Sequence, residues 1–159
     1  MKNYVSDTTN CIGRARTYVV LHLLITAVTL LPAGESKESN NPDPRWGHTF
    51  IYDPFHKQIL LFGGARKQGS YLDDTWIWDG TEWHRKNVVS PTARGFCGAA
   101  IHEERKTIIL HGGRGNQRVT YSDTWEWTGT DWKQLESQST FAADHHQMVY
   151  VASDNVILA

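Results

Sequence analysis

The chain holds eight histidines and two cysteines, the residue types that most often bind metal ions or act in catalysis. His145 and His146 are adjacent, so on a strand their side chains would point to opposite faces and would not both bind one ion. Cys11 and Cys97 show neither metal-site nor disulfide spacing. We therefore interpret Cys97 as a small buried apolar residue, and we expect no metal site and no cofactor.

The sequence also offers no set of residues for catalysis. No Ser-His-Asp set, no pair of carboxylates and no nucleotide-binding loop can be argued from it. The glycine pairs Gly63-Gly64 and Gly112-Gly113 are not followed by lysine-serine or lysine-threonine, and no helical pattern follows them, so a phosphate-binding role is a poor fit. Enzymatic activity stays open, but the sequence favours a protein that is not an enzyme.

Basic side chains between the expected strands are the remaining candidates for ligand chemistry. A guanidinium group binds a carboxylate or phosphate through two parallel hydrogen bonds. The net charge of the chain is −1, which argues against a nucleic-acid partner because such a partner would select a strong basic excess. The candidate residues are Arg45, Arg66, Lys67, Arg94, Arg114, Asn116 and Arg118.

An internal repeat organises the segments that carry these residues. The stretch from Asp74 to Trp83, D-T-W-I-W-D-G-T-E-W, returns from Asp123 to Trp132 as D-T-W-E-W-T-G-T-D-W, at an offset of 49 residues. The same offset matches Arg45 with Arg94, Ile59 with Ile108, Leu61 with Leu110, and the two glycine pairs. A period near 50 residues indicates a propeller or an array of repeats, not a domain with a single core.

Each repeat predicts four short antiparallel strands. Tight hairpins are expected at Asp79-Gly80 and at Thr128-Gly129, because these residues tolerate positive φ. A third unit begins at about Ala142 and stops at Ala159. The expected strands are His48–Tyr52, Gln58–Phe62, Trp76–Trp78 and Trp83–Arg85 in the first unit, and Cys97–Ile101, Thr107–His111, Trp125–Trp127 and Trp132–Gln134 in the second.

The repeated residues have structural interpretations. Trp76 and Trp78 are two positions apart and would share one face of a strand, which we expect to pack on a neighbouring unit. Stacking of a sugar on these rings is the alternative. Glycines at strand ends permit close approach of another backbone. The set of structural repeat residues is Gly63, Gly64, Trp76, Trp78, Trp83, Gly112, Gly113, Trp125, Trp127 and Trp132.

The glycine pair after the second strand, the downstream tryptophans and the N-P-D-P-R lead-in make the repeat resemble a kelch motif. The T-W-x-W-x-G-T-x-W variant is similar to kelch repeats of the galactose oxidase central-domain type. The resemblance implies an all-β fold of kelch-type β-propeller blades, with about two and a half present: residues 44–92, 93–141 and a partial blade at 142–159. Further blades or another chain would be needed to close a propeller.

The resemblance also implies where ligands would bind. In kelch propellers the turn before the first strand and the loop between the second and third strands lie on the same face. The seven candidate residues would then converge and attract an anionic ligand, a glycan or an acidic protein segment. The alternatives are that the loop arginines are merely solvated, or that Arg45 and Arg94 bond backbone carbonyls between blades.

The N-terminal part is typical of an export signal. Lys2, Arg14 and Arg16 precede an apolar run from Tyr18 to Leu31 that is short for a membrane span. Residues 1–33 are predicted to be a signal peptide or signal anchor, and 34–43 a disordered linker. A mis-assigned start or an apolar N-terminal strand is the alternative. The propeller part would be secreted, periplasmic or membrane-tethered outside the cytoplasm.

Three functional hypotheses follow. The first is an exported, non-catalytic binding scaffold that meets its partner through the loops. The second is the N-terminal piece of a secreted propeller enzyme, galactose oxidase-like or glycan-processing, although Cys97 lacks the tyrosine motif that would let copper-site residues be carried over. The third is a truncated copy without independent function, since an open stack of blades would expose its tryptophan faces.

Overall fold

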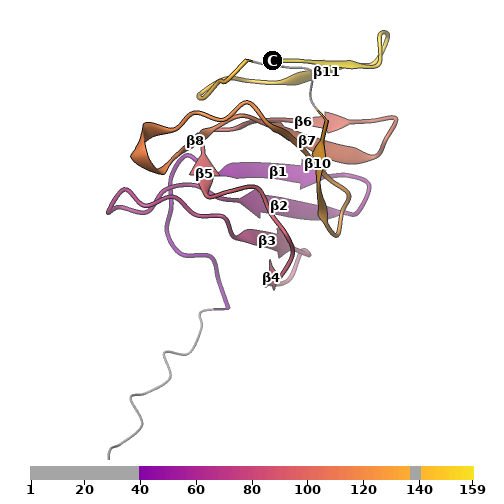
Figure 1. The fold of residues 1–159 in the computed structure, drawn as a ribbon. Helices are drawn as coiled ribbons and strands as arrows, with labels where there is room; N and C mark the ends of the chain where they lie inside the picture. Colours follow the sequence, from indigo (N-terminus) through magenta and orange to yellow (C-terminus); the bar gives the residue numbers. More distant parts are fainter. Residues whose placement is uncertain (1–39, 137–140) are drawn as a thin grey trace, which may run out of the picture. The chain divides into compact units, whose positions relative to one another are not determined.

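The computed structural model describes residues 40–136 and 141–159 (Figure 1). The predicted export signal, most of the predicted linker and residues 137–140 lie outside the described residues. No helix in the described ranges is long and apolar enough to cross a membrane.

The first unit is a sheet of four antiparallel strands in sequence order. The strands are β1 (Thr49–Asp53), β2 (Gln58–Phe62), β3 (Thr75–Trp78) and β4 (Trp83–Lys86). Residues of high β propensity make up β3 and most of β1, and a turn of Asp79 and Gly80 joins β3 to β4. Each strand lies within one or two residues of its predicted bounds.

The second unit repeats this sheet. Its strands are β6 (Gly98–His102), β7 (Thr107–His111), β9 (Thr124–Trp127) and β10 (Trp132–Leu135), again antiparallel and in sequence order. A third unit begins with the hairpin of β11 (Val149–Val151) and β12 (Val156–Leu158). The all-β prediction with four antiparallel strands per unit is confirmed.

Three short elements outside the four-stranded sheets were not predicted. Strand β5 (Arg94–Gly95) pairs with β8 (Arg114–Gly115), and a 3-10 turn η1 (Asn116–Arg118) follows β8. Two-residue strands carry no detectable periodicity in a sequence. Strand β8 and η1 lie in the loop that follows the second strand of the second sheet, and β5 pairs that loop with the segment before β6.

The 49-residue offset extends to the backbone conformation. Lys57, Lys106 and Asn155 hold equivalent places in the three hairpins, and their φ angles are 53°, 57° and 52°. Consecutive units are also joined at equivalent atoms. The Gly64 N–H donates to the Arg94 carbonyl at 2.8 Å, and the Gly113 N–H donates to the Ala143 carbonyl at 2.8 Å. The third unit therefore meets the second as the second meets the first.

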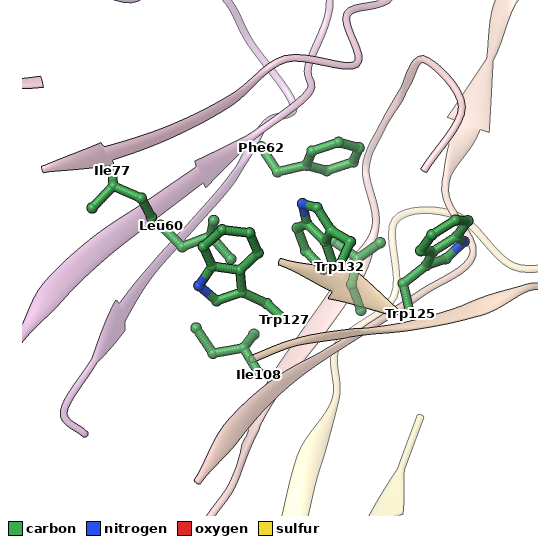
Figure 2. Packing of buried hydrophobic residues seen from close by; sticks show 8 residues of the cluster. Leu60, Phe62, Ile77, Ile108, Trp125, Trp127 and Trp132 are labelled. Carbon is green, nitrogen blue, oxygen red and sulfur yellow. The ribbon is translucent and has the colours of Figure 1, made fainter. Parts of the chain in front are cut away.

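The core lies between the first two sheets (Figure 2). Trp127 is fully buried there, and Figure 2 shows its ring near Leu60 and Ile108. Burying each large apolar side chain contributes about 2 to 3 kcal/mol. Leu60, Phe62 and Ile77 come from the first sheet, and Ile108, Leu110, Trp125, Trp127 and Trp132 from the second.

The opposite face of the first sheet is partly open. Ile77 belongs to the core cluster, so its neighbour Trp78 points away from the second sheet. The Trp78 and Trp83 rings lie 5.6 Å apart on that face, and Phe50 and Tyr52 are 55% and 54% exposed. In the second unit the equivalent tryptophans, Trp127 and Trp132, are buried.

Candidate partner-binding groove

Arg45 and Arg94, two of the predicted ligand-binding residues, are held inside the protein. The Arg45 guanidinium donates to both carboxylate oxygens of Asp74, at 2.5 and 2.9 Å, and to the Gly63 carbonyl at 3.1 Å. Arg94 makes the equivalent bonds to Asp123 and to the carbonyl of Gly112. Their side chains are only 3% and 1% exposed.

A tryptophan completes each of these arginine–aspartate pairs. The Trp76 indole donates to Asp74 at 2.7 Å, and the Trp125 indole donates to Asp123 at 2.7 Å. Burial by itself would raise the pKa of Asp74, but the hydrogen bonds from Arg45 and Trp76 outweigh it and hold that pKa below its usual value. Arg45 also donates to the Asp43 carbonyl and Arg94 to the Thr92 carbonyl, each two residues earlier in the chain, and in the part of the chain that the structure describes neither donates to a carbonyl of the following unit. The charge of each arginine is neutralised and unavailable to a ligand.

The other predicted residues have different surroundings. Arg66 forms an exposed ion pair with Asp43 at 2.8 Å, and Lys67 is exposed. Asn116 accepts a hydrogen bond from the Tyr71 backbone N–H at 3.2 Å. Among the described residues, Arg118 has no carboxylate within ion-pair distance.

Arg114, Asn116 and Arg118 line an open groove of about 370 Å³. The groove also contains four ring side chains that sequence reasoning did not select: Trp46, Tyr71, Phe96 and His145. Trp46 precedes β1, Phe96 precedes β6 and His145 precedes β11, so all three units contribute. Loops from successive units meet here because backbone hydrogen bonds fix the segments before their first strands.

The ring side chains of the groove form one cluster around Phe96. The imidazole of His145 stacks on the Phe96 ring, with centroids 3.9 Å apart and an interplanar angle of 21°. Trp46 and Tyr71 meet the same ring edge-on, at 5.2 and 6.4 Å. A sequence signal was present: at the 49-residue offset, Phe96 and His145 align with Gly47.

Among residues 40–136 and 141–159, the charged side chains that line the groove are basic, and the Asp144 carboxylate, which neighbours His145 in the chain, interacts with Arg114. Asp144 accepts a hydrogen bond from His145 at 2.8 Å, and this bond, helped by Arg114, lowers the pKa of Asp144. Asp144 therefore stays ionised and balances part of the charge of Arg114. Arg118 is exposed, so its guanidinium is accessible to a ligand.

A second, smaller pocket of about 240 Å³ lies beside the first strands of the three units. Burial, followed by the charge of Arg45, lowers the pKa of His48, and burial likewise lowers that of His146. Burial raises the pKa of the Cys97 thiol to about 12. These groups are neutral near pH 7. In residues 40–136 and 141–159, no cluster of three or more His, Cys, Asp or Glu side chains is arranged to hold a metal ion.

No family model matches the chain. A protein of Arabidopsis thaliana described as an F-box/kelch-repeat protein is 37% identical to it over 79 residues, a match that covers 43% of this chain. The matched part is 16% of that plant protein, so the chain corresponds to a small share of its length. Together with sheets of four antiparallel strands, this partial match fits a kelch-like fold.

Proposed function

We propose that the chain is a kelch-type interaction module that binds an anionic partner in the groove beside Phe96. The observation that carries the proposal is the placement of Arg114 and Arg118 in a groove with an aromatic wall. A guanidinium beside apolar rings forms stronger hydrogen bonds to carboxylates than one surrounded by water. In this proposal Arg45 and Arg94 stabilise the fold and do not contact the ligand, because Asp74 and Asp123 already neutralise their charges.

The proposal is tested by reversing the charge of the groove. The variant combines Arg114→Glu and Arg118→Glu, and the probe is an octaglutamate peptide titrated by calorimetry at low and high salt. We expect the full-length protein to bind the probe measurably at low salt and the variant to lose binding, because opposite charges attract most where salt screening is weak. The matched control combines Lys57→Glu and Lys133→Glu, which makes the same net charge change at exposed positions away from the groove. Equal affinity of the two double variants would overturn the proposal.

Export belongs to the same proposal. It is supported by Lys2, Arg14 and Arg16 before the apolar run from Tyr18 to Leu31, all outside the described residues. A reporter enzyme that is active only outside the cytoplasm, fused to residues 1–45, should become active in cells. Loss of that activity when Leu23 and Leu24 are replaced by Asp would support export, and an inactive parent fusion would exclude it.

We further propose that another blade covers the open face of the first sheet. Trp83 aligns with Trp132, whose ring is buried between the sheets, while Phe50, which lies beside Trp83, is exposed, as is Tyr52 on the same strand. The blade could come from this protein or from another chain. A galactose oxidase-type relationship remains part of this proposal, and catalytic residues in blades translated beyond Ala159 would support the enzyme alternative. A full-length protein that melts cooperatively as a monomer would argue against a truncated copy without function.

A further inference from the structure

The aromatic wall of the groove contains two side chains where the backbone favours glycine. Gly47, Phe96 and His145 hold equivalent places in the three units, and their φ angles are 62°, 57° and 55°. A bulky residue in this left-handed region costs folding free energy that glycine does not. The chain uses glycine in the first unit and ring side chains in the next two.

The backbone itself does not require those rings. The Phe96 N–H donates to the Gly47 carbonyl at 2.6 Å, and the His145 N–H donates to the Phe96 carbonyl at 3.0 Å. Glycine could make the same bonds with less strain. A Cβ on Gly47 would lie 2.5 Å from the Phe96 ring, so the missing side chain at Gly47 makes room for that ring.

The rings also leave apolar surface in contact with solvent. Trp46 is 57% exposed, and His145, which stacks on Phe96, is also exposed. Such a wall would pack a second flat ring through edge-on or stacked contacts. Arg114 and Arg118 lie in the same groove, so a ring and an anionic group could be bound together.

We propose that this groove recognises a peptide segment in which an aromatic side chain neighbours acidic ones. The inference rests on the proposed anion-binding function and adds the ring. Charge complementarity selects the acidic residues of the peptide. Arg118 can bind one of them without competition from a carboxylate among the described residues. At Arg114 a peptide carboxylate would replace the interaction with Asp144. A volume of about 370 Å³ suits one large side chain and its flanking residues. A peptide carries both groups on adjacent residues, whereas an acidic sugar carries no planar ring.

The test uses the full-length protein and four blocked peptides in calorimetric titrations. The parent peptide is Gly-Glu-Tyr-Glu-Gly, and the others replace tyrosine by leucine, both glutamates by glutamine, or all three. We expect the tyrosine-to-leucine change to weaken binding about tenfold, the size of an aromatic contact. Trp46→Ala and His145→Gly should each reduce that ring preference to about twofold or less. Glucuronic acid serves as the sugar arm and should bind no better than the leucine peptide.

The melting temperatures of the variants show whether a change in peptide binding comes from the groove or from a loss of folding. His145→Gly should leave the melting temperature unchanged or raise it, as Lys106→Gly should, since Lys106 has the same positive φ in an exposed hairpin away from the groove. Lys106→Gly should also keep the full ring preference.

The outcomes distinguish this inference from the function on which it rests. Binding that depends on glutamate but not on tyrosine would keep the proposed function and overturn the ring site. The ring site would also be overturned if the preference for tyrosine persisted in both Trp46→Ala and His145→Gly. The same would hold if His145→Gly were markedly less stable while its peptide binding stayed unchanged. Binding that ignores the glutamates, or no binding of any peptide, would overturn both.

Discussion

The indole Nε1 of Trp132 donates a hydrogen bond to the Thr75 hydroxyl at 3.0 Å, and this bond joins the second sheet to the first. Both residues are buried, and Trp132 also packs edge-on against Phe62, with ring centroids 5.2 Å apart. A polar link inside an apolar interface fixes how the sheets are aligned, because apolar contacts alone are less directional.

Replacing Thr75 by valine should therefore destabilise the protein by about 1 to 3 kcal/mol. The change keeps the shape of the side chain but leaves the Trp132 N–H buried without an acceptor. Chemical denaturation followed by tryptophan fluorescence would measure the loss. Thr81→Val, at an exposed turn position, is the control and should change stability by less than 0.5 kcal/mol. Equal effects of the two substitutions would mean that the hydrogen bond does not stabilise the interface.

The two kinds of arginine pair should differ in their contribution to stability. Arg94→Gln leaves the Asp123 carboxylate without its partner in a largely enclosed site and should cost about 2 to 4 kcal/mol. Arg66→Gln breaks the exposed pair with Asp43 and should cost at most about 1 kcal/mol. Urea titrations of both variants provide the comparison. A cost for Arg94→Gln as small as that for Arg66→Gln would contradict the structural role assigned to Arg94.

Lowering the pH through the range where Asp123 titrates should decrease the stability of the protein. Burial alone would raise the pKa of Asp123, but hydrogen bonds from Arg94 and Trp125 lower it below the unfolded value near 3.9. A carboxyl group whose pKa is depressed by folding stabilises the protein above the unfolded pKa, and this contribution is lost as the pH falls below it. Asp123→Asn should therefore be less stable than the parent at pH 7, and the difference should shrink below about pH 4. A difference that stays constant from pH 7 to pH 3 would rule out this linkage.

Comparing the parent with Asp123→Asn isolates the contribution of the Asp123 carboxyl to stability from the contributions of other groups that gain protons as the pH is lowered. The pKa values of His48 and His146 are lowered by burial, so protonation of the unfolded chain should reduce stability as the pH falls from about 6.5. The parent and the Asp123→Asn variant both contain these histidines, so the effect of the histidines cancels in the difference between the two stabilities.

The strands were predictable because their residues repeat with a fixed offset. Ile59 with Ile108 and Trp78 with Trp127 mark the same strands in both units, and the hairpin glycines mark the turns between them. The buried arginine pairs were not predicted. Nothing in the sequence shows that Arg45 and Asp74 meet, since they are separated by two strands, although both recur at the same offset as Arg94 and Asp123.

The groove was predictable only in part. The candidates Arg114, Asn116 and Arg118 line it, whereas the wall around Phe96 was not predicted. Its rings belong to three units and form a cluster only after the units are joined. A position occupied by Gly47 in one unit and by Phe96 and His145 in the others carried the relevant signal, because it departs from the repeat. In this chain the position that departs from the repeat marks the proposed groove, whereas the repeated tryptophans and glycines mark the sheets.

Gly112 should tolerate no side chain, and a comparison with Gly80 separates the cost of steric contact from the cost of backbone strain. A Cβ at Gly112 would lie 2.3 Å from the Ala143 carbonyl oxygen, and φ is 63°, so Gly112→Ala meets both penalties. Gly80 has φ of 103° but no atom within 4 Å of an added Cβ, so Gly80→Ala meets the strain alone. We expect a loss of about 1 kcal/mol for Gly80→Ala and at least twice that for Gly112→Ala, since the contact can be relieved only by moving the third unit away from the second. Hydrogen exchange of the Gly113 N–H, which donates to Ala143, should be faster in Gly112→Ala and unchanged in Gly80→Ala. If the two variants lose the same stability and leave Gly113 equally protected, close packing of the third unit against Gly112 is wrong.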